Sequence, residues 1–392
     1  MTNNPEVARA RSSGKRMSVV WLIIGLLIGA ALGSVVVYSY GPRSSTSSSP
    51  SLSSPLYSVA SASPFSVGAA GTLQFAWGSL LNNTFEKVYP NIKVAELFEG
   101  SGAVATTEVT TKQFSLEAAA DTSVIPTNLF TNITDYQIAF GETQVVIIVN
   151  LASTPGMNVY SAWQTAQSQT PFSSQWNSSW QQIFTTIALS NAVVGVSNPF
   201  TDPSGYQGAG MIRLAGLAFF GNVSQLYDAI YNNPNKYVMR DTETDLVTLA
   251  ESDQVDFITS AYESNAISQV ANQPSLAYIT LPNFINLGDL SQLSYYYQGN
   301  FNYTEQGTTN SYTLNPVVYC LTIPKPSTNP DAATLFILTM WSSQGQSTLE
   351  ANGITPLLPV IIDGNSSSIP SVLLPFTTPA NSTTSQIFPS GG

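Results

Sequence analysis

Histidine is absent from the 392-residue sequence, and cysteine occurs once, at Cys320. The absence of histidine excludes serine–histidine catalysis and the histidine-rich sites that bind zinc. A single cysteine cannot form a disulfide framework or a thiolate metal site. Cys320 lies in the apolar segment "NPVVYCLTIP", which predicts a small, buried residue of a strand.

Charged residues are also scarce, at 9% of the sequence, and acidic residues outnumber basic ones 23 to 12. This balance argues against nucleic acid as a partner. A surface of hydroxyl and amide groups keeps its hydration when carboxylates become protonated, and without histidine no side chain gains charge between neutral and moderately acidic pH. We therefore expect the protein to work in an acidic exterior.

An enzymatic function has little support in the sequence. Paired carboxylates such as Asp202 and Glu263 could cleave glycosides, but nothing in the residues around either one supports this. Carboxylates at such positions commonly cap helices or lie in solvent. The sequence therefore favours a binding protein over an enzyme.

A long apolar segment lies near the N-terminus. Residues 17–38, "MSVVWLIIGLLIGAALGSVVVY", carry no charge and are long enough to cross a bilayer as a helix. The basic residues that precede it predict that residues 1–16 are cytoplasmic and that the rest of the chain lies outside the cell. A cleaved signal is the alternative, and both interpretations predict export.

Segments rich in serine, threonine and proline flank the predicted folded part. Residues 39–66 are typical of a flexible stalk, and residues 364–392 form a tail of similar composition. N-glycosylation sequons recur along the chain, and their asparagines are expected on the surface of an exported protein. These asparagines are Asn82, Asn132, Asn177, Asn222, Asn302, Asn365 and Asn381.

Alternating strand and helix patterns predict an α/β fold. The segment "TLQFAWGSLLNN" predicts a strand, a glycine–serine turn and a helix, and "NIKVAELFE" predicts a second strand parallel to the first. Two segments could cross between lobes, one after Asn150 and one near Asn315. We therefore expect a hinged clamp, with lobe 1 formed by residues 67–150 and 316–363 and lobe 2 by residues 151–315.

Polar turns at the ends of predicted strands are candidate anion sites. Ser79 in "WGSLL" and Ser101 in "EGSGAV" each start a predicted helix, where free backbone N–H groups and the helix dipole favour an anion. A plain N-cap is the simpler interpretation of Ser79. Asp121 in "AAADTSVIP" and Asp202 in "SNPFTDPSGYQG" mark two more such turns, and helix capping is the default role there. Neutral donors can bind an oxyanion without a buried cation.

The order of these motifs, from about Leu73 to Asp363, resembles the archaeal tungstate/molybdate-binding proteins of ABC importers, in the type II periplasmic-binding-protein superfamily. Segments that carry the resemblance include "EGSGAV", "GETQVVIIVN", "VGVSNPFTDPSGYQG", "TETDLVTLAESDQVDF" and "SSQGQSTLEANGITPLLPVI". The resemblance implies a two-lobe clamp with mixed sheets that binds molybdate or tungstate outside the cell. It further implies delivery to a membrane permease with its ATPase, no cofactor and no enzymatic activity.

Site residues also follow from the resemblance. Ser79 matches the serine of the first turn, and Asp121 matches the aspartate of the family's "ADY" turn. Asp202 and Tyr206 match the carboxylate and the tyrosine of the family's "DPCGY" turn. Ser101 stands two positions before the place of the second-turn serine.

In this archaeal branch, two carboxylates approach the metal of the bound oxyanion, and Asp202 matches the first. The second belongs just before the tyrosine of a "YxSVA" segment, where this chain has Ala261. Glu263, on the other side of that tyrosine, is the candidate to replace it. A one-residue shift turns a helical side chain by about 100 degrees, so a solvated surface position for Glu263 is the alternative.

Two other functions remain open from the sequence. If Glu263 is not a ligand, the same fold could bind another anion, such as sulfate or phosphate, or a small organic solute. The stalk and the sequons also fit a surface structural or adhesive glycoprotein. The polar turns between the lobes argue against that last function, because an adhesin does not need a hinged cleft.

Overall fold

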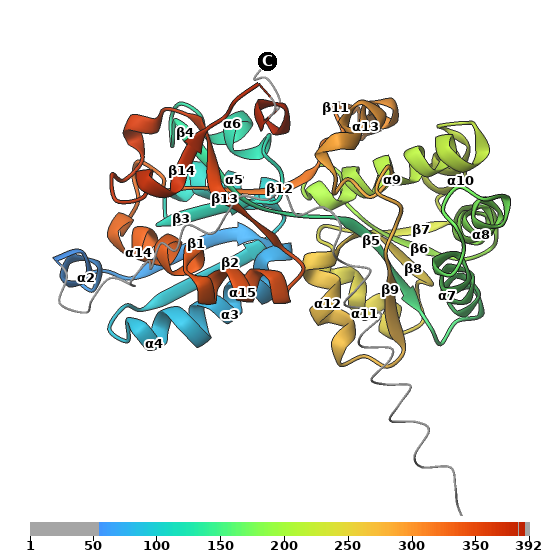
Figure 1. Ribbon diagram of the computed structural model, residues 1–392, viewed down its shortest axis with the longest axis horizontal. Coiled ribbons are helices and arrows are strands. Elements are labelled where there is room, and N and C mark those ends of the chain that lie inside the picture. Colours follow the sequence, from blue (N-terminus) through green and yellow to red (C-terminus); the bar gives the residue numbers. More distant parts are fainter. Residues whose placement is uncertain (1–54, 383, 389–392) are drawn as a thin grey trace, which may run out of the picture. The chain divides into compact units, whose positions relative to one another are not determined.

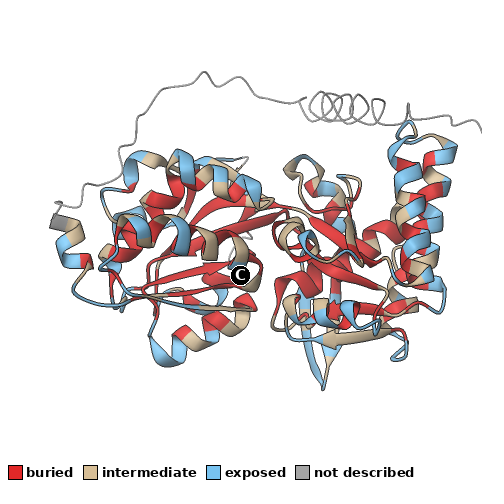
Figure 2. Cartoon of the chain, turned by 90° about the horizontal axis from the view of Figure 1, so that it is seen from below, coloured by how far each residue is buried: buried red, intermediate tan, exposed pale blue. Residues whose placement is uncertain are grey.

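The computed structural model describes residues 55–382 and 384–388, which form two mixed β-sheets with helices packed against them (Figure 1). Strands of both sheets are mostly buried, and exposed residues gather on the outer sides of the helices (Figure 2). We call the seven-stranded sheet with its helices lobe 1, and the five-stranded sheet with its helices lobe 2. The predicted two-lobe α/β fold with mixed sheets is confirmed.

The sheet of lobe 1 has the strand order β14-β13-β4-β12-β3-β1-β2. β1 pairs in parallel with β2 and β3, whereas β12 runs antiparallel to β3 and β4. β1 and β2 therefore end at the same edge of the sheet. The strands are β1 (Phe65–Ala70), β2 (Val94–Glu99), β3 (Leu116–Ala119), β4 (Tyr136–Thr143), β12 (Val317–Thr322), β13 (Thr355–Gly364) and β14 (Thr377–Pro379).

The sheet of lobe 2 has the strand order β7-β6-β8-β5-β9. β6 pairs in parallel with β7 and β8, and β5 runs antiparallel to β8 and β9. A separate antiparallel hairpin is formed by β10 and β11. The strands are β5 (Val145–Asn150), β6 (Val194–Ser197), β7 (Tyr237–Arg240), β8 (Phe257–Tyr262), β9 (Leu276–Ile279), β10 (Phe301–Glu305) and β11 (Thr308–Tyr312).

Helices connect most of the strands. Those of lobe 1 are α2 (Pro55–Ala60), α3 (Gln74–Leu80), α4 (Glu86–Val88), α5 (Ser101–Thr111), α6 (Val124–Leu129), α14 (Pro330–Trp341) and α15 (Ser343–Ala351). Those of lobe 2 are α7 (Thr154–Gln167), α8 (Ser174–Phe184), α9 (Pro203–Phe220), α10 (Gln225–Tyr231), α11 (Thr244–Glu251), α12 (Glu263–Ala271) and α13 (Leu293–Tyr296).

The chain crosses between the lobes at Gln144, which separates β4 from β5, and it returns between β11 and β12. The predicted first crossing, after Asn150, is therefore wrong by one strand. The apolar run "VVIIV" forms most of β5, in the sheet of lobe 2. Such a run suits the interior of either sheet, so its hydrophobicity did not indicate to which lobe it belongs.

The first strand of lobe 1 also lies earlier than predicted. The segment "TLQFAW" does not form a strand, because residues 72–73 belong to the short helix η1 (Gly71–Leu73) and α3 begins at Gln74. Its aromatic side chains belong to the helix α3 and not to a strand. Trp77 is fully buried and packs edge-on against Phe336 of α14, with ring centroids 5.1 Å apart.

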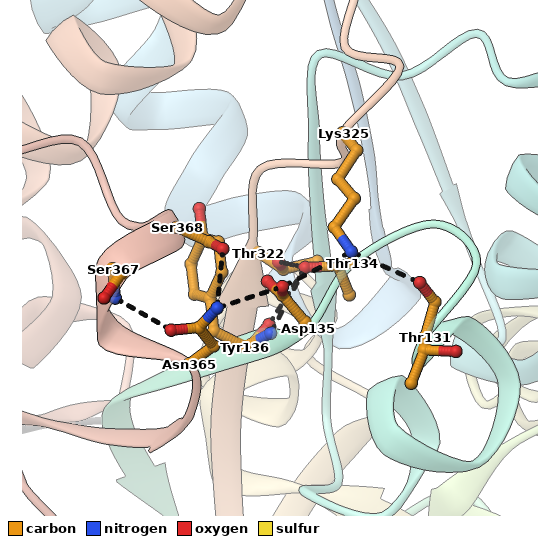
Figure 3. A network of polar contacts seen from close by, with 9 residues as sticks. All are labelled: Thr131, Thr134, Asp135, Tyr136, Thr322, Lys325, Asn365, Ser367 and Ser368. Atoms are coloured by element: carbon orange, nitrogen blue, oxygen red, sulfur yellow. Dashed lines mark hydrogen bonds and ion pairs between the residues drawn. The ribbon is translucent and has the colours of Figure 1, made fainter.

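The described part of the predicted tail folds onto lobe 1. β14 pairs in parallel with β13, and Ile387 and Phe388 are buried. Figure 3 shows a polar contact at the start of this segment: Asn365 Nδ2 donates to Asp135 Oδ2 at 3.3 Å, and Lys325 Nζ lies 3.3 Å from the same oxygen. The sequence predicted that this segment lies outside the folded part of the chain, and that prediction is wrong for the described residues.

The described end of the predicted stalk is folded as well. α2 packs against α14, where Asn329 Nδ2 donates to the carbonyl oxygen of Ala60 at 2.8 Å. The predicted membrane span at residues 17–38 lies outside the described residues, as do residues 1–16. Within the part that is described, every helix is too short or too polar to cross a bilayer. Cys320 is buried in β12, as predicted.

Candidate functional site

Four strand-to-helix connections, two from each lobe, meet around one small cavity. β1 leads into η1 and β2 into α5 in lobe 1, while β6 leads into α9 and β7 into α11 in lobe 2. Each of these strand pairs is parallel, so its two strands end at one edge of the sheet. The cavity is lined by Ala70, Gly71, Thr72, Gly100, Ser101, Asp202, Thr242, Glu243 and Thr244.

The cavity offers hydrogen-bond donors, and none of these lining residues is basic. α5, α9 and α11 begin here, and the first N–H groups of a helix have no partner within the helix. Thr72 is 3% exposed, and its Oγ1 makes no hydrogen bond to any described residue. Helix starts of this kind favour an anionic ligand.

Asp202 connects the starts of two helices. It is the N-cap of α9, where its Oδ1 accepts a hydrogen bond from the N–H of Ser204 at 2.9 Å. Its Oδ2 accepts a hydrogen bond from the N–H of Glu243 at 3.0 Å. Burial raises the pKa of Asp202, and these N–H groups offset part of that effect. The default expectation of a helix cap is confirmed, and the side chain also lines the cavity.

Glu243 is a second carboxylate at the cavity, and the sequence analysis did not identify it. It is 1% exposed and directly precedes α11. Its Oε2 accepts a hydrogen bond from the N–H of Tyr262 at 3.4 Å, and its Oε1 accepts one from Asn265 Nδ2 at 3.3 Å. Burial raises the pKa of Glu243 well above its ordinary value, and the Asp202 carboxylate raises it further.

One signal in the sequence could have pointed to Glu243. The segment "KYVMR" is apolar enough for a strand, and Glu243 follows it closely. A strand predicted there, parallel to the strand before Asp202, would have placed both carboxylates at one sheet edge.

Of the two predicted serines, only Ser101 lies at the cavity. It is the first residue of α5, and its Oγ accepts a hydrogen bond from the N–H of Ala120 at 3.1 Å. Ser79 lies inside α3, where its Oγ accepts a hydrogen bond from Asn83 Nδ2 at 3.4 Å. The predicted turn at Ser79 is therefore wrong. A hydroxyl residue stands between glycine and leucine in both "GTL" and "GSL", and it is Thr72 of the first segment that follows β1.

Asp121 lies beside the cavity rather than in its lining. Its Oδ1 accepts a hydrogen bond from the N–H of Ser123 at 2.7 Å. Its Oδ2 accepts a hydrogen bond from Gln207 Nε2 at 3.2 Å, and the Gln207 Oε1 accepts one from the hydroxyl of Tyr262. Asp121 therefore links lobe 1 to α9 and β8 of lobe 2.

Tyr206 lies near the start of α9, whose N-cap is Asp202. Its ring stacks on Tyr312 of the β10–β11 hairpin, with centroids 4.5 Å apart. Together with Asp202 it lines a more open groove next to the cavity. Burial raises the pKa of Tyr206 well above its ordinary value, with a contribution from Asp121, so the phenol stays neutral.

Glu263 does not join Asp202 at the cavity. It is the first residue of α12, and its Oε2 accepts a hydrogen bond from Gln144 Nε2 at 2.7 Å. Its Oε1 accepts one from the hydroxyl of Tyr278 at 3.4 Å. Because β8 ends at Tyr262, the start of α12 directs this side chain toward the crossing between the lobes. The expected pairing of Glu263 with Asp202 is therefore corrected.

The predicted glycosylation sequons lie at the surface. Six of the asparagines are exposed, and Asn177 is half-buried in α8. Asn365 is engaged in the contact of Figure 3, where its Nδ2 donates to Asp135 and to Ser368 Oγ. The exposed asparagines are Asn82, Asn132, Asn222, Asn302, Asn365 and Asn381.

Residues 65–355 match the family model described as bacterial extracellular solute-binding protein. This range begins with β1 and ends at the start of β13, so it includes all four connections around the cavity. Its length is most of the described chain.

Two similar relatives are the molybdate/tungstate-binding proteins WtpA of Thermococcus kodakarensis and Pyrococcus abyssi. The first is 28% identical over 364 residues, which cover 87% of this chain and 94% of the relative. The second is 29% identical over 294 residues, covering 70% of this chain and 78% of the relative. The sulfate-binding protein SubI from Mycobacterium tuberculosis is similar in structure, with a TM-score of 0.50 and 13% identity over 75% of this chain and 87% of SubI. That likeness shows a shared periplasmic-binding-protein fold.

Proposed function

The chain belongs to the bacterial extracellular solute-binding protein family, and we propose that it captures molybdate or tungstate between its lobes for delivery to a membrane ABC permease. As a member of this family the protein is a receptor and not an enzyme. The observation that carries the ligand assignment is the meeting of three helix starts with the Asp202 carboxylate at one cavity. The WtpA relatives support the choice of oxyanion.

The oxyanion's oxygens would accept hydrogen bonds from the lobe edges. In lobe 1 the donors are the Thr72 and Ser101 hydroxyls and the first N–H groups of α5. In lobe 2 they are the start of α11 at Thr244 and the hydroxyls of Thr242 and Thr244, because the first N–H groups of α9 are already bonded to Asp202. Donors on both lobes would make the ligand the bridge that holds the clamp closed.

The remaining predicted residues would act around the ligand. Asp202 would approach the metal of the oxyanion through a carboxylate oxygen. Asp121 would hold the lobes together through Gln207, and Tyr206 would fix the hairpin against α9 through Tyr312. Glu263 would brace the crossing between the lobes at Gln144 instead of contacting the ligand.

We also propose that residues 17–38 anchor the protein in the membrane and that sugars are attached to its exposed sequons. The support is the uncharged apolar segment and the surface position of the asparagines. N-terminal sequencing of protein purified from membranes distinguishes a retained anchor from a cleaved signal. Intact-mass measurement before and after enzymatic deglycosylation shows whether sugars are attached.

Isothermal titration with tungstate, molybdate, sulfate and phosphate tests the ligand assignment. We expect saturable binding of tungstate or molybdate with one site per chain. Circular dichroism of the same sample establishes that the protein is folded. A folded protein that gives heat only with sulfate or phosphate would show that another oxyanion is the ligand.

A further inference from the structure

Two fully buried glutamates of lobe 1 lie away from the lining of the cavity. Glu108 belongs to α5 and Glu117 to β3, and both are 0% exposed. Glu108 Oε2 accepts a hydrogen bond from the N–H of Phe114 at 2.9 Å. Its Oε1 and both carboxylate oxygens of Glu117 make no hydrogen bond to any described residue. Because a buried, ionised carboxylate without a partner is unfavourable, this arrangement favours a proton on the pair.

The side chain of Glu117 lies on the face of the sheet that α5 covers. In the strand register Glu117 stands between Gly68 of β1 and Thr322 of β12. Ala119, two residues further along β3, is on the same face and packs in a cluster with Ala105 of α5. Glu117 is therefore enclosed between the sheet and the helix that carries Glu108.

Few charged or titratable groups face this pair. Those on α5 and on the same face of the sheet are Lys112 at the C-cap of α5, Glu99 of β2, Cys320 of β12 and Asp121 after β3. Lys112 is the one cation among these groups, and its charge acts on Glu108. β1 and α6, which also pack against α5, contain no titratable side chain. Glu117 is thus buried without a cation to balance its charge.

The two carboxyl groups differ in their surroundings. Burial raises the pKa of Glu117 well above its ordinary value, and the Glu108 carboxylate raises it further. Burial also raises the pKa of Glu108, but the N–H of Phe114 and the charge of Lys112 act in the opposite direction. A single proton on the pair is therefore best placed on Glu117, with the negative charge on Glu108.

α5 connects this pair to the oxyanion cavity. Ser101 begins α5 and lines the cavity, and its Oγ accepts a 3.1 Å hydrogen bond from the N–H of Ala120, directly after β3. Glu108 joins the same helix to Phe114, which precedes β3. α5 is therefore fastened near both ends of β3, and the glutamate pair lies between the two attachments.

The start of α5 also lies close to lobe 2. A Cβ atom on Gly100, which precedes α5, would collide with the carbonyl oxygen of Thr201. A small displacement of α5 would therefore change both the lining of the cavity and the contact between the lobes.

We propose that Glu108 and Glu117 share one proton, and that loss of this proton displaces α5 and weakens oxyanion binding. This inference rests on the proposed function and adds a dependence on the acidity of the surroundings. With the proton in place, the pair carries one negative charge, which the N–H of Phe114 stabilises. Without it, two charges repel each other between α5 and β3, and movement of the helix relieves that repulsion. The protein then binds the oxyanion more tightly in acid than at neutral pH.

Calorimetric titration with tungstate, from mildly acidic to neutral pH, tests this dependence. Glu117→Gln keeps the shape of the protonated carboxyl group and cannot ionise. Glu350→Gln is the matched control, because Glu350 is an exposed carboxylate of α15 in the same lobe. As the pH rises, we expect wild type and Glu350→Gln to lose affinity relative to Glu117→Gln, by about fivefold or more at neutral pH. The same tungstate solutions serve all three proteins, so changes in the anion itself cancel in the comparison.

Infrared spectroscopy gives a second measurement, which needs no ligand. A protonated carboxyl group has a carbonyl stretching band that an ionised carboxylate lacks. We expect the difference spectrum between wild type and Glu117→Gln to contain this band in acid, and to lose it over the pH range in which the tungstate affinity of wild type falls.

Two results would overturn the proposal. One is a ratio of tungstate affinities between Glu117→Gln and wild type that changes by less than about twofold across the pH range, with both proteins shown to be folded. The other is a difference spectrum without the band of a protonated carboxyl group in acid. Failure of the folded wild-type protein to bind tungstate or molybdate at any pH, with the infrared band present, would instead overturn the proposed function.

Discussion

The N–H of Glu243 donates a 3.0 Å hydrogen bond to Oδ2 of Asp202, which joins the starts of α11 and α9. The Oδ1 of the same carboxylate caps α9 through Ser204. A single side chain therefore fixes two helix starts and also lines the cavity. Loss of this carboxylate should affect both folding and ligand binding, and the two effects can be measured separately.

Asp202→Ala should lower the free energy of unfolding by about 1 kcal/mol through loss of the cap. It should also weaken tungstate binding by about tenfold or more. Denaturant unfolding and calorimetric titration measure the two effects. Ser173→Ala is the control, because Ser173 caps α8 through the N–H of Trp176 and does not line the cavity. Tungstate binding within about twofold of wild type would mean that Asp202 is no ligand.

Gly100→Ala should interfere with closure of the lobes. Gly100 precedes α5 in lobe 1, and a Cβ atom there would collide with the carbonyl oxygen of Thr201 in lobe 2. We expect weaker tungstate binding and a smaller ligand-induced decrease in the radius of gyration in solution scattering. In the control Gly78→Ala, a Cβ has nothing within 4 Å, so binding should not change. Equal tungstate affinities for Gly100→Ala and wild type would contradict the close approach of Gly100 to the carbonyl oxygen of Thr201.

Glu117 should make the fold more stable in acid. It is fully buried, neither carboxylate oxygen bonds to another described residue, and burial raises its pKa well above 4.5, with a contribution from Glu108. Because the folded-state pKa is the higher one, this contribution is fully present below the unfolded pKa. It is lost as pH rises through the folded pKa.

Melting temperatures of wild type and Glu117→Gln, measured from acidic to neutral pH, test this expectation. The variant cannot ionise at this position, so its advantage over wild type should grow as the pH rises. A difference between the two proteins that does not change with pH would refute the assigned role of Glu117. A fold that Glu117 makes more stable in acid agrees with the expectation that the protein works in an acidic exterior.

Phe388→Ala should destabilise lobe 1 although the residue lies near the end of the chain. Phe388 is 8% exposed and belongs to a cluster with Val318 and Ile361. Loss of a buried aromatic ring costs about 3 kcal/mol or somewhat less at this site. Val372, which is 46% exposed, provides the control variant Val372→Ala, with an expected change of about 0.5 kcal/mol or less. Denaturant unfolding distinguishes the two, and equal stabilities would mean that the segment contributes nothing to the core.

Local patterns predicted the features that depend on neighbouring residues. The turn "TDPSG" predicted a polar helix start at Asp202, and "EGSGAV" predicted one at Ser101, because both follow short apolar strands. The alternation of strands and helices predicted the fold class. These features need only the strand or helix on either side of the turn.

Features that depend on distant contacts were missed. Glu243 reaches Asp202 only because β7 pairs with β6, and the apolar segment "KYVMR" predicts a strand without indicating which strand it pairs with. The segment after residue 363 has the composition of a linker. It nevertheless contains β14, which forms because it pairs with β13. Thr72 was missed because β1, "FSVGAA", is short and rich in small residues and lies next to the predicted stalk.

The most direct test of the account is isothermal titration of the folded, wild-type protein with tungstate. We predict saturable binding with one oxyanion per chain, because the connections around the cavity come from both lobes of a single chain. Absence of heat with both tungstate and molybdate, from a sample shown by circular dichroism to be folded, would contradict the account.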